Sequence, residues 1–374
     1  MRKLSRNSPL TVVISAEGLA TASLGCYGCS WNETPAIDRL ASGGVVWDRW
    51  TATTDQPTGL ITDWLKKLSQ QEIAKRSLLI TDEPALETVD IKIYKRQVLE
   101  RSGELVFQED IQNTAFGRLF SEADRQLSRE TSLLWIHTAA IRDLWDAPRN
   151  IEPDLVMREP QEEQVGEEPE EEKVAFQLPP TTMPPRHQRN HDDHPDLVFA
   201  WMQRYAEVIQ LLDDLIAWST EAWESRRPTF VVAGTSGFAL GENGWIGHRL
   251  GPLRSCDIRL PLIVSGGGPI RVGELQGASA FCSILNRVVH REEVVTPESW
   301  CAPAEDKLVS TASDRAERAI TTQSWFWVRD PIKPETLPED RLFLKPDDQF
   351  DINDVSRLRP DVIDSLEASS QESV

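Results

Sequence analysis

Short apolar runs alternate with amphipathic stretches along most of the chain. Most of the apolar runs are rich in β-branched or leucine residues and end at glycine or polar residues, as is typical of buried strands in a parallel sheet. Strands are predicted in this way at 11–15, 77–81, 132–137, 229–233 and 260–264. Apolar periodicity and capping residues predict helices at 34–41, 62–71, 115–127, 196–218 and 280–289. The alternation predicts an α/β fold, with a mostly parallel central sheet flanked by helices and functional loops at the carboxyl ends of its strands.

The end of the chain has a different pattern. Residues 316–329 predict two short strands of an antiparallel subdomain. We therefore divide the chain into an α/β domain over 8–268 and a small C-terminal α+β subdomain over 269–374.

An acidic, proline-rich insertion is predicted at about 152–190. Its first part, Glu152 to Lys173, has ten acidic residues against Arg158 and Lys173. Such a segment cannot bury enough apolar surface to order itself, so we expect a solvated, mobile loop. Within it, we expect 159–173 to be dispensable for folding.

Charge and composition exclude several classes of protein. The 374 residues carry a formal net charge of −20, which argues against nucleic acid or an anionic membrane as partner. No stretch approaches the roughly 20 apolar residues that span a bilayer. The basic N-terminus has no separate apolar region before the first strand, so we expect a cytoplasmic protein. Five cysteines are an odd number, which argues against a disulfide framework.

Several motifs occur together after the first strand. Gly25-Cys26-Tyr27-Gly28 is followed by Thr34-Pro35-Ala36-Ile37-Asp38-Arg39-Leu40, where Thr34 is the predicted N-cap and Pro35 the first helical residue. In order and spacing they resemble the N-terminal signature of the sulfatases, in the alkaline-phosphatase superfamily. The segments 233–244, 259–268 and 341–355 continue the resemblance, the last to certain bacterial sulfatases, so it spans nearly the whole chain and implies a sulfatase-like fold.

The resemblance also implies that the active site is degenerate. Sulfatases follow the first strand with two aspartates that hold a divalent cation, and Glu17 and Gly18 stand there. Their Cys-x-Pro-Ser-Arg motif, which supplies the formylglycine nucleophile, corresponds to Asp55 through Gly59. A later metal-binding Asp-His pair corresponds to Thr235 and Ser236.

Few candidate site residues remain. Asp55, His137 and His248 are the vestigial catalytic candidates: His137 lies at a strand end, and His248 lies near the lysine or histidine that contacts sulfate in the family. A satisfied core histidine is the plainer interpretation of His137. Glu17 and Asp55 are the only carboxylates left for a metal. Thr54 or Thr58 could replace the lost nucleophile, although that chemistry needs metal ions.

Two classes of function stay open. The first is a non-catalytic homologue, a pseudo-sulfatase with a binding or regulatory role, whose partner is an active sulfatase or a small anionic ligand and which needs no cofactor. The second is an active sulfuric or phosphoric ester hydrolase with a rebuilt, non-formylglycine site, which would need Ca²⁺ or Mg²⁺. The number of missing groups favours the first.

Two further groups of residues have a chemical and a plainer interpretation. Cys26 and Cys29 have the spacing of a redox pair but no thioredoxin-like surroundings. His187, His191 and His194 could converge on a metal, but a proline-rich loop before a helix favours capping and solvation.

Overall fold

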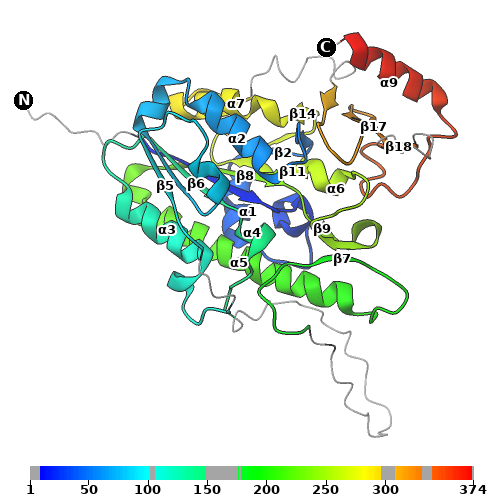
Figure 1. The fold of residues 1–374 in the computed structure, drawn as a ribbon. Coiled ribbons are helices and arrows are strands. Elements are labelled where there is room, and N and C mark those ends of the chain that lie inside the picture. The colour runs from blue at the N-terminus through cyan, green and yellow to red at the C-terminus, as the bar shows by residue number, and fades with distance from the viewer. Residues whose placement is uncertain are drawn as a thin grey trace, which may run out of the picture.

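The computed structural model describes residues 9–101, 106–148, 176, 178–295, 308–330 and 339–372. An eight-stranded sheet runs through the molecule in the order β13-β2-β12-β8-β1-β6-β4-β5 (Figure 1). These strands are Ile270–Val272 (β13), Val45–Trp47 (β2), Leu262–Val264 (β12), Thr229–Ser236 (β8), Thr11–Glu17 (β1), Leu133–Thr138 (β6), Ser77–Thr81 (β4) and Lys95–Val98 (β5).

The predicted α/β class with a mostly parallel sheet is confirmed. Strands β8, β1, β6, β4 and β5 are parallel neighbours, and β12 runs antiparallel between β8 and β2. The strand predicted at 260–264 is divided in two, Arg259–Leu260 (β11) and the antiparallel β12. The residue between them is Pro261, which has no N–H to donate to a strand ladder.

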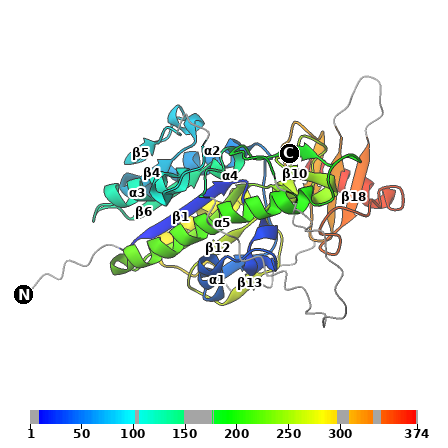
Figure 2. The same cartoon turned by 90° about the horizontal axis from the view of Figure 1, so that it is seen from below.

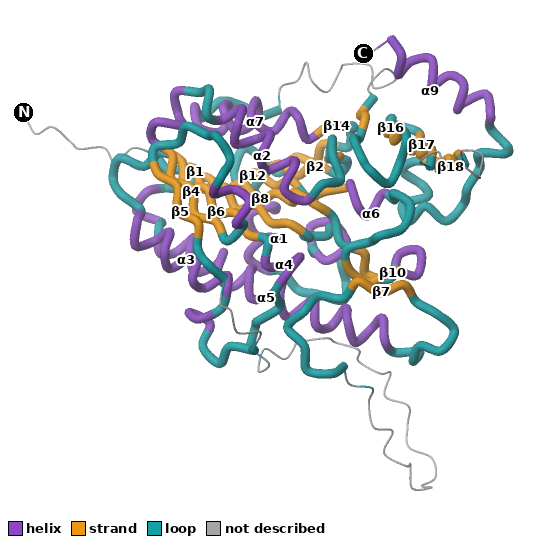
Figure 3. The backbone as a smooth tube through the Cα atoms, in the orientation of Figure 1, coloured by secondary structure: helices purple, strands orange, loops and turns teal. Residues whose placement is uncertain are grey.

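Helices cover both faces of the sheet (Figures 2 and 3). Val12, Ile14 and Ala16 of β1 face a core shared with α1, α3 and α5, whereas Val13 faces a second core shared with α2 and α7. The helices are Pro35–Ser42 (α1), Pro57–Leu68 (α2), Ala115–Gln126 (α3), Ala140–Asp143 (α4), Leu197–Ala222 (α5), Ser255–Ile258 (α6) and Phe281–His290 (α7). The helix predicted at 62–71 is α2, which starts earlier because Pro57 is its first residue.

The N-terminus of α1 is capped from another helix. Thr34 stands at the predicted N-cap position, but its hydroxyl accepts a hydrogen bond from Gly25 N at 3.0 Å. The free N–H groups of Ala36 and Ile37 donate instead to the Asp213 carboxylate of α5, at 2.9 and 2.8 Å. Asp213, 177 positions from Ala36 in the sequence, therefore caps the N-terminus of α1 in place of Thr34.

A small four-stranded antiparallel sheet follows near the end of the chain. It contains Val309–Ser310 (β15), Arg318–Thr321 (β16), Trp325–Arg329 (β17) and Asp340–Leu344 (β18), which confirms the two strands predicted within 316–329. Helix α9 (Pro360–Glu372) packs against it through Ile363 and Leu366. The boundary at residue 268 stays a prediction; β13 and α7, beyond that boundary, join the large sheet and its second core.

Two further three-stranded sheets border the large one. The first joins Arg186–Gln188 (β7), Trp245–Gly247 (β10) and Ala239–Leu240 (β9), and the second joins β11, Trp50–Thr51 (β3) and Gln276–Gly277 (β14). Strand β7 lies in the last part of the predicted acidic insertion, whereas 159–173 falls outside the described residues. In the part of the chain that the structure describes, no helix is long and apolar enough to cross a bilayer.

Candidate functional site

Four neighbouring strands end at one edge of the large sheet, and polar residues stand at each end. Glu17 ends β1, His137 and Thr138 end β6, Asp82 and Glu83 follow β4, and β8 ends with Thr235 and Ser236. The pairing of β1 with β8 shifts by one residue between Ala16 and Glu17, so that Glu17 lies opposite Ser236. Such bulges re-aim side chains beside functional sites.

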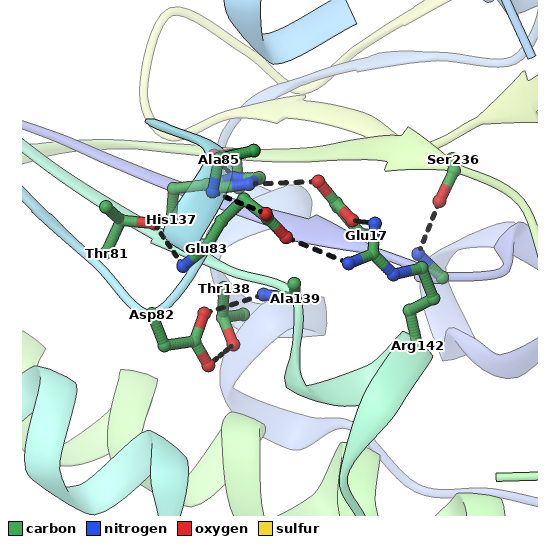
Figure 4. Close-up of polar contacts among 12 residues, drawn as sticks. Glu17, Thr81, Asp82, Glu83, Ala85, His137, Thr138, Ala139, Arg142 and Ser236 are labelled. Carbon is green, nitrogen blue, oxygen red and sulfur yellow. Dashed lines mark hydrogen bonds and ion pairs between the residues drawn. The ribbon is translucent and has the colours of Figure 1, made fainter. Parts of the chain in front are cut away.

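Glu17 is fully buried, and its carboxylate lies next to the side chains of Arg142 and His137. Arg142 Nη1 forms an ion pair with its Oε2, and His137 Nε2 lies 3.4 Å from its Oε1 (Figure 4). Burial raises the pKa of Glu17, and His137 and Arg142 oppose that rise. A carboxylate so far from water needs this compensation to keep its charge.

A short hydrogen-bond chain fixes the His137 ring. The Trp135 indole N–H donates to Ser15 Oγ at 2.8 Å, and Ser15 Oγ lies 2.8 Å from His137 Nδ1. All three groups are satisfied when the Ser15 hydroxyl donates to Nδ1, which leaves the proton of a neutral ring on Nε2, facing Glu17. His137 is thus buried and bonded, as its plainer interpretation expects, and also contacts Glu17.

Arg142 connects Glu17 to two other carboxylates. Its Nη2 lies 2.8 Å from Glu83 Oε2 and 2.6 Å from Asp143 Oδ2. Burial lowers the pKa of Arg142, but the Asp143 hydrogen bond and the charges of Glu17, Asp143 and Glu83 outweigh it, and the pKa is raised. Arg101 adds a second cation to the cluster, with Nη1 2.7 Å from Asp143 Oδ2.

Asp82 fixes the start of the helix that carries Arg142. Its carboxylate accepts hydrogen bonds from Ala139 N at 2.8 Å and Thr138 Oγ1 at 3.1 Å, just before α4 (Figure 4). Burial raises the pKa of Asp82, and the charge of Arg101 opposes the rise. The end of β4 therefore orients the backbone that places Arg142 over Glu17.

Asp55, the catalytic candidate that the sequence resemblance suggests, is also paired with an arginine. Its Oδ2 accepts from Arg315 Nε at 2.8 Å and from Ser313 Oγ at 2.7 Å, and its side chain is 3% exposed. Arg315 also lies 3.2 Å from Asp257, whose pKa burial raises. The carboxylate of Asp55 is thus part of a buried ion-pair network that joins the loop between β3 and α2 and helix α6 to the segment before β16.

His248 lies within electrostatic reach of both arginine clusters. Its pKa is lowered to about 4, first by burial and then by the charges of Arg315, Arg186 and Arg142, whereas Asp55 opposes the change. The imidazole is therefore neutral at pH 7. The charges of Asp55 and Arg142 both act on His248, and this electrostatic coupling links the sequence candidates to the Glu17 cluster.

The divalent cation that the resemblance implies does not fit the side chains present. Gly18 supplies no ligand, Ser236 Oγ accepts a hydrogen bond from Gly18 N at 2.9 Å, and Thr235 contributes only a hydroxyl. Glu17 is already paired with Arg142. Across the described ranges, no three His, Cys, Asp or Glu side chains are arranged to hold a metal ion. A hard cation such as Ca²⁺ prefers six or more oxygen ligands, which these side chains do not supply.

Sequence reasoning missed the arginines and the carboxylates around them. Asp82 and Glu83 directly follow a predicted strand, and that position was a usable signal. Arg142 lies in the short segment after the predicted strand that ends at His137, but only the path of α4 shows that it reaches Glu17. Arg315 lies 260 residues from Asp55, and nothing in its neighbourhood indicates the contact.

The other candidate groups do not assemble a site. His187, His191 and His194 each contact a different carboxylate, those of Asp193, Asp192 and Asp196. Burial raises the pKa of Cys26 to about 12 and also raises that of Cys29, which disfavours the reactive thiolate of a redox pair. Thr54 Oγ1 accepts from Gln56 N at 3.2 Å, and Thr58 is the second residue of α2.

Solved structures with the same fold cover nearly the whole chain. The phosphonate monoester hydrolase of Agrobacterium radiobacter aligns with a TM-score of 0.68 at 13% identity, over 98% of this chain and 96% of that one. The phosphonate monoester hydrolase of Silicibacter pomeroyi gives 0.66 at 11% identity, over 97% and 94%. A 2-O GAG sulfatase gives 0.64 at 11% identity, over 98% and 92%.

Comparison by sequence gives no further relative, since no family model and no curated protein matches the chain. At 10–13% identity the structural likeness speaks for the fold alone. The strand order, the helices on both faces and the small antiparallel sheet near the end of the chain agree with it. The chain therefore has the same fold as these solved sulfatase and phosphonate monoester hydrolase structures.

Proposed function

We propose that this chain is a non-catalytic protein of the sulfatase fold, a pseudo-sulfatase with a binding or regulatory role. The observation that carries the proposal is that both carboxylates retained at the expected site are paired with arginines, Glu17 with Arg142 and Asp55 with Arg315. A nucleophile must present an unpaired, activated atom to its substrate. Asp55 Oδ1 has no hydrogen-bond partner among the described residues, but it is buried, and the charge of the carboxylate is paired with Arg315 through Oδ2, which also accepts from Ser313.

The missing groups also weigh heavily on the rate of any hydrolysis. Ester cleavage of this kind needs positive charge preorganised against the oxygen charge that develops in the transition state, and removing one such group costs about 10²- to 10³-fold. Here the nucleophilic cysteine, its neighbouring arginine and three cation ligands are replaced together, by Asp55, Gly59, Gly18, Thr235 and Ser236.

As binding partner we propose either a small anion or an active sulfatase, in the cytoplasm. The anion is supported by the charges of Arg315, Arg186 and Arg142, which all act on His248. If an anion binds there, sulfate or phosphate should raise the melting temperature relative to chloride at equal ionic strength. Arg186→Ser should weaken that response, because Arg186 is exposed to solvent, whereas Arg142 and Arg315 are paired with the carboxylates of Glu17 and Asp55.

An ester panel tests the absence of catalysis. The purified chain would be incubated with an aryl sulfate, an aryl phosphate and an aryl phosphonate monoester, with and without Ca²⁺ or Mg²⁺. We expect no turnover above that of an Asp55→Asn variant prepared in parallel. Turnover that Asp55→Asn abolishes would overturn the proposal and establish an active hydrolase with a rebuilt site.

A further inference from the structure

The cluster at the carboxyl edge of the sheet contains a cation that belongs to the chain itself. Figure 4 shows the Arg142 guanidinium between the carboxylates of Glu17 and Glu83. Its Nε also donates to Asp143 Oδ1 at 2.8 Å. One planar group thus contacts three carboxylates, a geometry that suits guanidinium better than ammonium.

The space beside Glu17 is filled by the helix that carries this arginine. Gly18 has a φ of +87°, and a Cβ there would lie 3.3 Å from Ile141 Cγ2 and 3.4 Å from Arg142 N. The Ile141 side chain and the backbone of α4 therefore leave little room beyond a Cβ at position 18, and the positive φ makes any side chain there strained. Ser236, on the other side, is bonded to Gly18 N and is not turned toward Glu17 as a ligand.

We propose that the guanidinium of Arg142 replaces the divalent cation of this fold as the counter-charge of Glu17. The folded chain then needs no metal at this edge of the sheet and binds none there. Three observations carry this inference: the Arg142–Glu17 ion pair, the crowded left-handed backbone at Gly18 and the absence, among the described residues, of a group of side chains fit for a metal. It goes beyond the proposed function, because it concerns charge balance and folding and not turnover.

Replacing Arg142 by a small polar residue should leave Glu17 without its counter-charge and make room for a metal ion. Arg142→Ser leaves Glu17, Glu83 and Asp143 facing a space the size of the lost guanidinium. Among the described residues, Arg101 forms ion pairs with Glu83, Asp143 and Asp82 and none with Glu17. In the unchanged chain these carboxylates are not arranged to hold a metal, but without the guanidinium they are free to turn toward one another, and carboxylate oxygens are the ligands that Ca²⁺ prefers. A ligand that binds only the folded state raises the melting temperature.

The experiment measures the melting temperature of the full chain in EDTA, Ca²⁺ and Mg²⁺. We expect the unchanged protein to melt within about 1 °C in all three, since it has no site to fill. Arg142→Ser should melt several degrees lower in EDTA and recover by about 2 °C or more in millimolar Ca²⁺. Arg142→Lys, which keeps a cation, and Arg39→Ser, an exposed arginine on α1, should show no Ca²⁺ response.

A second variant keeps the proposal testable if Arg142→Ser fails to fold. In Glu17→Gln/Arg142→Ser the buried carboxylate is removed together with its counter-charge, so the double variant should melt higher than Arg142→Ser alone and lose the Ca²⁺ response.

The proposal fails if the unchanged chain is stabilised by a divalent cation, or if elemental analysis finds one stoichiometric ion that Glu17→Gln removes. It also fails if the double variant melts no higher than Arg142→Ser. Hydrolysis by metal-free protein would overturn the proposed function and leave this inference intact.

Discussion

Ser15 joins two buried groups that have no other hydrogen-bond partner among the described residues, the Trp135 indole N–H and His137 Nδ1. Ser15→Ala leaves both unpaired in a site that excludes water. We expect a loss of about 1–3 kcal/mol in the free energy of unfolding, measured by urea denaturation. Ser42→Ala, which removes an exposed bond to Arg39 O, is the control and should change it by less than about 0.5 kcal/mol. An equally small effect of Ser15→Ala would show that the chain does not hold the ring.

His248 offers a direct titration of the arginine charges. Its folded pKa of about 4 lies below the ordinary 6.5, so the unfolded chain binds the extra proton as pH falls from 6.5 to 4, and this group's contribution to stability is lost over that window. Arg315→Gln removes the charge that acts on it most, and should raise the His248 pKa. NMR of labelled histidine measures both values, with Arg39→Gln as control. A pKa near 6.5 in the unchanged chain would contradict the structure.

At the scale of residues, the sequence could identify positions but not pairings. Glu17, Asp55, His137 and His248 were found because each stands at a strand end or at a motif position. Their arginine partners depend on backbone paths that no local pattern encodes. Gly18 shows the limit well: restoring an aspartate there looks simple in the sequence, yet its φ of +87° and the contact with α4 oppose any side chain.

Between helices, too, a contact that is distant in sequence fixes the structure: Asp213 of α5 caps the start of α1. Asp213 accepts from two N–H groups at the start of α1, and burial raises its pKa to about 6 despite those bonds. Helix positions were well predicted because apolar periodicity reports them directly. The cap was not, since the Thr34 hydroxyl is engaged with Gly25 and a distant carboxylate takes its place.

Neighbouring carboxylates on α5 allow a matched test of this junction. Asp213→Ala should lower the free energy of unfolding by about 1–3 kcal/mol, because two buried N–H groups lose their acceptor. Asp214→Ala removes an exposed carboxylate one residue along and should cost less than about 0.5 kcal/mol. Equal effects of the two substitutions in urea denaturation would show that α1 does not depend on Asp213.

The whole molecule is a sheet between two helical layers, with a smaller sheet attached near the C-terminus. Alternation of strands and helices sufficed to predict this class. The antiparallel direction of β12 could not be predicted, because an apolar run looks the same in either direction.

The acidic segment gives a prediction at this scale. Deleting 159–173 should leave the melting temperature within a few degrees, because the segment is highly charged and lacks apolar periodicity. Differential scanning calorimetry of the deleted and full chains measures this. A large drop would mean that the segment packs against the fold.

The ion pair between Arg315 and Asp55 also has a consequence for folding during translation. During translation Asp55 is synthesised well before Arg315, so every strand of the large sheet exists before Asp55 can form this ion pair. Asp257, by contrast, has a second arginine within 3.6 Å, Arg249, which precedes it in the chain. A chain that ends at residue 307 is therefore expected to be cut readily by protease near Asp55, and full-length Arg315→Gln should share part of that sensitivity; resistance in both would contradict it. The ion pair that stabilises the loop around Asp55 therefore forms only after the segment around Arg315 has been translated.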